Sequence, residues 1–180
     1  MTSGYYALGT TLRYTNPSFY RAFICDPGAV FIPLVNNMAL VTIDASPSGS
    51  NFAFNHFEGA SFENPNGKTG CSGIKITADT GNPDITNNKF VNMSFKDLEC
   101  GVLLDRVTDP VTYAGETRFD WNVLTNLSYI DCNYGFKSVC GSGTGNVFNT
   151  GVSLCTTAAM AWFARQCGHT IASRRRCPCW

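Results

Sequence analysis

The 180-residue chain lacks an excess of charge of either sign. Thirteen basic residues balance thirteen acidic residues, and only 14% of all residues are charged. Such a chain has no overall attraction for nucleic acid or for an anionic membrane surface. No apolar run reaches the roughly 20 residues that a membrane-spanning helix requires. We therefore expect neither nucleic acid nor a membrane as a partner.

Signals for export and for familiar catalysis are also missing. Residues 1–5 carry neither the basic region nor the apolar region of a signal peptide. The sequence contains no glycine-rich phosphate-binding loop and no recognisable serine, histidine and aspartate set. We expect no cofactor, and we expect assembly in the cytoplasm in which the chain is made.

The cysteines do not form a recognisable framework. There are nine of them, an odd number, and their spacing follows no disulfide pattern. Cys71 and Cys100 occupy nearly equivalent places in the repeat described below, yet buried free thiols are the favoured state. Near the C-terminus, Cys167, His169, Cys177 and Cys179 are too tightly spaced for a usual zinc site. We expect no metal.

What the sequence does contain is a pattern that recurs four times between residues 55 and 155. The copies begin at Asn55, Asn88, Asn122 and Asn146, so the periods are 33, 34 and 24 residues. The additional residues of the longer copies fall at two places and leave the apolar segments intact. Insertions of this kind are typical of solenoid proteins, in which each repeat stacks on the next.

Side chains within each copy alternate between apolar and polar, which predicts short strands with one buried face. Strands this short need stacked neighbours at about 4.8 Å to bury that face. Equivalent residues should then lie above one another. The expected aromatic column is Phe62, Phe95 and Tyr129, and the expected apolar column is Ile74, Val102 and Phe136. The asparagines that begin the copies should lie at turns, where they hydrogen-bond to the main chain.

The repeated segments resemble a known family. They read Asn88-Lys89-Phe90, Ser94-Phe95-Lys96-Asp97 and Gly101-Val102-Leu103-Leu104 in the second copy. These segments are similar to those of right-handed parallel β-helix proteins of the pectin-lyase-like superfamily, and the short, asparagine-rich strands resemble those of phage tail spikes. The resemblance implies an all-β fold, a right-handed parallel β-helix.

The expected domain organisation is simple. Residues 1–155 form the parallel β-helix, with irregular first turns over residues 1–50 and regular repeats over residues 55–155. The early strands are expected at residues 8–14, 22–25, 29–35 and 38–44, with a turn at residues 26–28. Residues 156–180 comprise a helix and a basic, cysteine-containing tail. That helix would cover the open end of the solenoid, where edge strands are otherwise unpaired.

The richest candidate binding surface is the insertion between residues 105 and 121. Carboxylates, guanidinium groups and aromatic rings lie close together in this segment, and they suit a sugar ligand because rings stack on pyranose faces and charged groups bind hydroxyls. Loops on a rigid scaffold often carry function. The candidate substrate-binding residues are Asp105, Arg106, Asp109, Tyr113, Glu116, Arg118, Asp120 and Trp121. The alternative is an ordinary solvated loop.

A second candidate is a pair of carboxylates one repeat apart. Asp97 and Asp131 occupy equivalent positions, and stacking would place them about 4.8 Å apart. Retaining glycosidases hold their acid and nucleophile about 5–5.5 Å apart, so these two are the candidate catalytic residues. Asn64 occupies the same position in the first copy. This favours a turn-capping column over catalysis.

The resemblance implies a function but names no sugar. The motifs of polygalacturonases and pectate lyases are absent, so the enzyme question stays open between a polysaccharide hydrolase, a lyase and no enzyme. The favoured expectation is a spike- or fibre-like module of a virion tail, a homotrimer that binds a surface polysaccharide with or without cleaving it. The alternatives are a stand-alone extracellular carbohydrate-active enzyme and a purely structural coil.

Overall fold

The computed structural model describes residues 1–15, 21–44, 52–77, 85–105, 119–138 and 147–152. The described part is all-β, and it contains no helix. The strands are β1 (Gly4–Leu8), β2 (Leu12–Thr15), β3 (Ala22–Pro33), β4 (Ala39–Asp44), β5 (Phe52–Ala53), β6 (His56–Glu63), β7 (Ser72–Thr77), β8 (Ile85–Thr86), β9 (Lys89–Lys96), β10 (Cys100–Asp105), β11 (Phe119–Asp120), β12 (Val123–Ile130), β13 (Tyr134–Ser138) and β14 (Val147–Val152).

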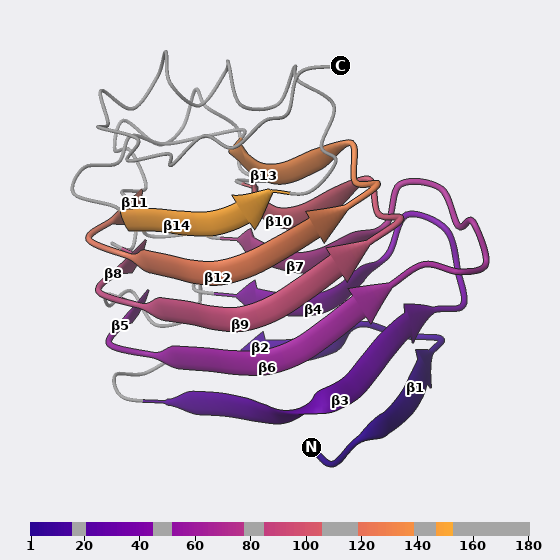
Figure 1. Ribbon diagram of the computed structural model, residues 1–180, viewed down its shortest axis with the longest axis horizontal. Coiled ribbons are helices and arrows are strands. Elements are labelled where there is room, and N and C mark those ends of the chain that lie inside the picture. Colours follow the sequence, from indigo (N-terminus) through magenta and orange to yellow (C-terminus); the bar gives the residue numbers. More distant parts are fainter. Residues whose placement is uncertain (16–20, 45–51, 78–84, 106–118, 139–146, 153–180) are drawn as a thin grey trace.

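The strands form three sheets, and all of the pairs within them are parallel. The first sheet has the order β1-β3-β6-β9-β12-β14, the second β13-β10-β7-β4-β2, and the third β11-β8-β5. From β3 to β12 the chain visits the three sheets in turn and then returns to the first, one strand further along (Figure 1). The passages from β1 to β3 and from β12 to β14 have described strands in the first two sheets alone. We call one such passage a circuit. Each circuit lies against the next as a layer.

The predicted columns are confirmed. In the first sheet Phe62 pairs in register with Phe95, and Phe95 with Tyr129. Their ring centroids lie 5.2 Å apart at both steps. The column continues toward the N-terminus through Phe31, 5.5 Å from Phe62, and Tyr6, 5.4 Å from Phe31. In the second sheet the register confirms the apolar column of Ile74, Val102 and Phe136.

The recurring glycine of each copy follows from this packing. Gly73, Gly101 and Gly135 share one register in the second sheet and face the aromatic column of the first sheet. A Cβ atom on Gly101 would lie 2.6 Å from Cε1 of Tyr129, well inside contact distance. The aromatic rings therefore fill the space that a larger residue would need.

The asparagines that begin the copies form a buried ladder. Oδ1 of Asn88 accepts hydrogen bonds from the backbone N–H and from Nδ2 of Asn55, each at 3.0 Å. Oδ1 of Asn122 accepts the same two bonds from Asn88, at 3.0 and 2.9 Å. The Asn122 amide donates in turn to the carbonyl of Ile85. The turn positions are as expected, but these side chains also bind one another.

The N-terminal circuits are more regular than the sequence suggested. The strand expected at residues 8–14 is confirmed only in its second half, because β2 begins at Leu12, whereas Leu8 ends β1, which joins a different sheet. The turn expected at residues 26–28 is wrong. β3 continues through it from Ala22 to Pro33, with a register shift relative to β6 between Ile24 and Ala29. Parallel pairing thus includes β1, β2, β3 and β4 as well.

Two further expectations concern the cysteines and the C-terminus. Cys71 and Cys100 are buried free thiols, as expected. Burial raises the pKa of the Cys100 thiol to about 12, so this cysteine stays protonated and unreactive. The helix and tail expected at residues 156–180 lie outside the described residues.

Candidate functional site

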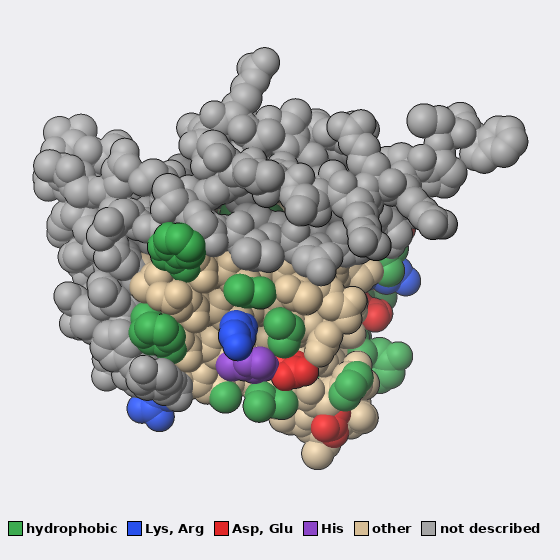
Figure 2. Space-filling view, turned by 60° about the vertical axis from the view of Figure 1, so that its left-hand side comes forward, with side chains coloured by type: hydrophobic (Ala, Val, Ile, Leu, Met, Phe, Trp, Pro, Cys, Tyr) green, Lys and Arg blue, Asp and Glu red, His purple; other side chains and the backbone are tan. Residues whose placement is uncertain are grey.

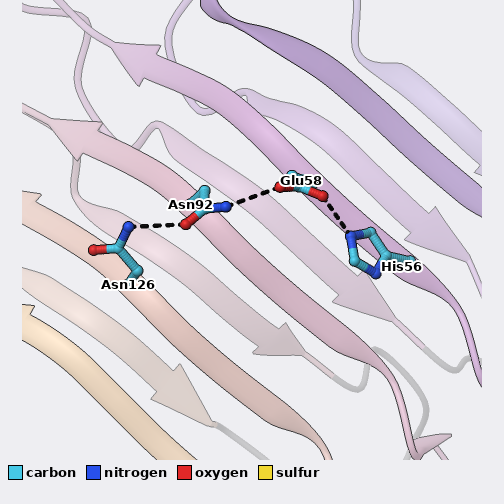
Figure 3. A network of polar contacts seen from close by, with 4 residues as sticks. All are labelled: His56, Glu58, Asn92 and Asn126. Atoms are coloured by element: carbon cyan, nitrogen blue, oxygen red, sulfur yellow. Dashed lines mark hydrogen bonds and ion pairs between the residues drawn. The ribbon is translucent and has the colours of Figure 1, made fainter.

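The outer face of the first sheet carries a continuous row of polar side chains across three strands. Nδ2 of Asn126 on β12 donates to Oδ1 of Asn92 on β9 at 2.8 Å. Nδ2 of Asn92 donates to Oε1 of Glu58 on β6, also at 2.8 Å. Oε2 of Glu58 lies 2.7 Å from Nε2 of His56 (Figure 3). We call these four residues the polar row. It runs across the strands, from one circuit to the next.

The backbone explains why asparagines occupy the row. Asn92 and Asn126 have φ angles of 55° and 53°, and Gly59 occupies the same place in β6 with a φ of 87°. Asparagine and glycine adopt this left-handed conformation at least cost. Each long strand of the first sheet therefore bends at this point, and the bend directs the amide groups outward.

Glu58 accepts hydrogen bonds from both of its neighbours in the row, Asn92 and His56. Hydrogen bonds from His56 and then from Asn92 hold the pKa of its carboxyl group below the ordinary value. Both of its oxygens are engaged, one by each partner. The carboxylate is therefore held in place as an anion, with one hydrogen bond to each of its two oxygens from within the row.

A second column lies at the corner that leads into the first sheet, two residues before His56 on the first of these circuits and five residues before Asn92 and Asn126 on the next two. It consists of Phe54, Asn87 and Trp121, which we call the corner column. All three have left-handed backbones, with φ angles of 59°, 55° and 56°. Phe54 is 46% exposed and Trp121 is 61% exposed. Two large aromatic side chains thus lie at corners two circuits apart, and Asn87 occupies the corner between them.

A basic residue lies beside these rings. Lys89 begins β9, is exposed, and pairs in register with His56 on one side and with Val123 on the other. His56, Lys89 and Val123 each lie two residues after the member of the corner column on the same circuit. Figure 2 shows this side of the molecule, where a basic, a histidine and an acidic side chain gather between hydrophobic side chains. Aromatic, cationic and amide groups are therefore combined on one surface.

The predicted loop residues are only partly brought together. Trp121 belongs to the corner column, whereas Asp105 ends β10 in the second sheet and forms an ion pair with Lys75 at 2.7 Å. Asp120 lies in β11, but its side chain is outside the described part. The remaining five candidates also lie outside the described residues: Arg106, Asp109, Tyr113, Glu116 and Arg118.

The candidate acid pair occupies equivalent turns. Asp97 and Asp131 directly follow β9 and β12, have φ angles of 57° and 51°, and are exposed. The backbone N–H of Asp97 donates to the carbonyl of Ile130. Asn64 occupies the same position one circuit earlier, and its amide donates to the carbonyls of Asp97 and Lys68. Asn64 therefore caps the turns at this position. Catalysis by Asp97 and Asp131 stays a prediction.

Several residues of this surface were missed by reasoning from the sequence. Phe54 was not selected, although it directly precedes Asn55 just as Trp121 precedes Asn122. Aligning the residue before each repeat asparagine would have revealed an aromatic, polar, aromatic alternation. The bond between Glu58 and Asn92 could not have been found in this way, because the two residues are not equivalent in the repeat.

No family model, curated protein or solved structure matches the chain. Within the ranges that the structure describes, no group of His, Cys, Asp and Glu side chains could hold a metal ion. The same part of the chain has no helix that is long and apolar enough to cross a membrane.

Proposed function

We propose that this chain is a right-handed parallel β-helix that binds a surface polysaccharide through the corner column and the polar row. Three parallel sheets visited in turn, with equivalent residues in register, support the β-helix. Right-handedness follows from the strong preference of parallel strand crossovers for that hand.

The observation that carries the binding proposal is the conformation of the two exposed aromatic residues. A left-handed backbone costs an L-residue other than glycine or asparagine about 1–2 kcal/mol. Asn87 shows that asparagine fits this corner, yet Trp121 occupies it with a side chain that is 61% exposed, and Phe54 with one that is 46% exposed. A strained backbone at residues that are not buried is typical of positions retained for function.

The dimensions of the surface suit a polymer that lies across the strands. Phe54 and Trp121 are two circuits apart, which corresponds to roughly 9.6 Å at about 4.8 Å for each strand spacing. The polar row crosses the strands in the same direction, with His56 two residues past the corner and Asn92 and Asn126 five residues past it. Pyranose rings would stack on the two aromatic faces, while amide groups of the row and the corner bind sugar hydroxyls.

The biological setting rests on the resemblance to tail spikes alone. By that resemblance we propose a homotrimeric, spike-like module of a virion tail. A stand-alone extracellular carbohydrate-active enzyme would instead run as a monomer in size exclusion, and it would release reducing ends or unsaturated sugars from a polysaccharide panel. A purely structural coil would bind no member of the panel.

The test is a binding assay of the full chain against a panel of immobilised polysaccharides. Covering about 60 Å² of an indole face contributes about 1.5 kcal/mol, so Trp121→Asn should weaken binding to any positive polysaccharide about tenfold. Phe54→Asn should act similarly, since asparagine keeps the corner conformation. The matched control is Tyr5→Asn, because Tyr5 is 77% exposed on β1, away from this surface. Wild-type binding by both corner variants would refute the proposal.

A further inference from the structure

Lys89, the exposed cation that follows the corner column, forms no ion pair with any residue in the described part of the chain. Among the described residues, no carboxylate lies within 4.0 Å of the Lys89 amine. Lys96 on the same strand likewise forms no ion pair within 4.0 Å among the described residues, but it has an acidic neighbour in register. Lys96 ends β9 and pairs in register with Glu63, so opposite charges are neighbours there. The two ends of the outer face therefore differ in charge balance.

Glu58 is the acidic residue nearest to Lys89 in register, and it is already engaged. It pairs with Val91, two residues along β9 from Lys89. Its two oxygens accept hydrogen bonds from Asn92 and His56. The carboxylate is thus turned to the polar row, and Lys89 is left with a positive charge that faces solvent.

The position of Lys89 connects this charge to the proposed ligand. On its own circuit it follows Asn87, the middle member of the corner column, by two residues. Phe54 and Trp121 lie on the circuits to either side. A sugar chain stacked on both rings would therefore pass the Lys89 amine midway between them. His56, on the adjacent strand in the same register, adds a second nitrogen donor at this level.

We infer that the polysaccharide is anionic, with a carboxylate or sulfate group that binds Lys89 between the two aromatic rings. This inference rests on the proposed function and names its ligand class. The surface supplies apolar stacking at two levels and, between them, a cation that forms no ion pair with the described residues. Charge complementarity of this kind selects among ligands of similar shape, because a neutral sugar leaves the cation unpaired and gains nothing from it.

The experiment compares anionic polysaccharides with neutral counterparts that have the same backbone. A uronic acid polymer is tested against its carboxyl-reduced form, and a sulfated polymer against its desulfated form. Each is titrated into the wild-type chain, Lys89→Gln, Lys96→Gln and Trp121→Asn at low and at high salt. Lys96→Gln is the matched control, because it removes the same charge from the other end of the same strand.

The expected result is that one anionic polymer binds the wild-type chain about fivefold more tightly than its neutral form at low salt. Lys89→Gln should abolish this difference and the salt dependence, whereas Lys96→Gln should keep both. Whichever pair shows the difference identifies the anion as carboxylate or sulfate.

Two outcomes would overturn the inference. Equal binding of anionic and neutral forms is one, and identical behaviour of Lys89→Gln and Lys96→Gln is the other. If Trp121→Asn still weakens binding about tenfold in either case, the proposed function stands and only the ligand class is wrong. If Trp121→Asn binds every polymer as the wild type does, the proposed function fails as well.

Discussion

Replacing Asn88 by alanine should be far more damaging than the loss of one amide group at the surface. Asn88 is fully buried, and its Oδ1 is the acceptor for two donors of Asn55. In the alanine variant the Asn55 backbone N–H loses its partner inside the protein, although the Asn55 amide still donates to the carbonyl of Ala53. Leaving one buried donor unsatisfied costs about 1–3 kcal/mol.

A second contribution comes from the other side of the ladder. Nδ2 of Asn88 donates to Oδ1 of Asn122 at 2.9 Å, and the variant loses this bond as well. Oδ1 of Asn122 keeps the bond from the Asn88 backbone N–H, so this loss is that of one ordinary hydrogen bond, about 0.5–1.5 kcal/mol. The sum predicts that Asn88→Ala lowers the free energy of unfolding by about 2–4 kcal/mol.

The assay is urea unfolding followed by far-ultraviolet circular dichroism, with Asn133→Ala as the control. Asn133 is exposed, and its amide donates to Oε2 of Glu99 at 2.5 Å. Because water replaces that bond, the control should lose less than about 1 kcal/mol. If Asn88→Ala lost no more than Asn133→Ala, the buried ladder would not stabilise the stacked circuits and this reasoning would be refuted.

Three further predictions concern the core, a thiol and the polar row. Gly101→Ala should lower the free energy of unfolding by about 1–3 kcal/mol, because its Cβ would collide with the Tyr129 ring; unchanged urea unfolding would contradict this. Cys100, whose pKa is about 12, should resist iodoacetamide in the native protein and react after denaturation, as read by peptide mass spectrometry. The pKa of Glu58 is lowered in the folded state by His56 and Asn92, so its stabilising effect is present above the ordinary value of 4.5 and is lost as the pH falls through the folded-state pKa. The melting temperature of the wild type should therefore fall more steeply between about pH 5 and pH 3 than that of Glu58→Gln, and parallel curves would contradict the assignment.

The regular part of the fold was predictable because one physical rule governs it. A repeat with period-two alternation buries its apolar side chains only if equivalent strands stack, so Phe62, Phe95 and Tyr129 had to form a column. The N-terminal circuits follow the same rule, but the number of residues between equivalent positions is not constant there. In β3 the residues between Ile24 and Ala29 shift the register against β6, and no copy of the repeat can be recognised by eye.

The candidate surface was harder to predict, since its members come from positions with different roles in the repeat. Trp121 was selected as part of an insertion, and its position as the residue before Asn122 was overlooked. The left-handed backbone of Phe54 and Trp121 leaves no trace in the sequence, because asparagine or glycine is the residue expected there. Likewise, the partners of Glu58 depend on which faces of β6 and β9 meet.

The measurement that tests the account most directly is calorimetric titration of the wild-type chain with a length series of one bound oligosaccharide. Phe54 and Trp121 are two circuits apart, so a chain that spans roughly 10 Å can reach both rings, whereas a shorter one reaches a single ring. The account predicts a rise in affinity of about tenfold once that length is passed, and no such rise for Trp121→Asn. An affinity independent of length, or a rise that persists in Trp121→Asn, would contradict it.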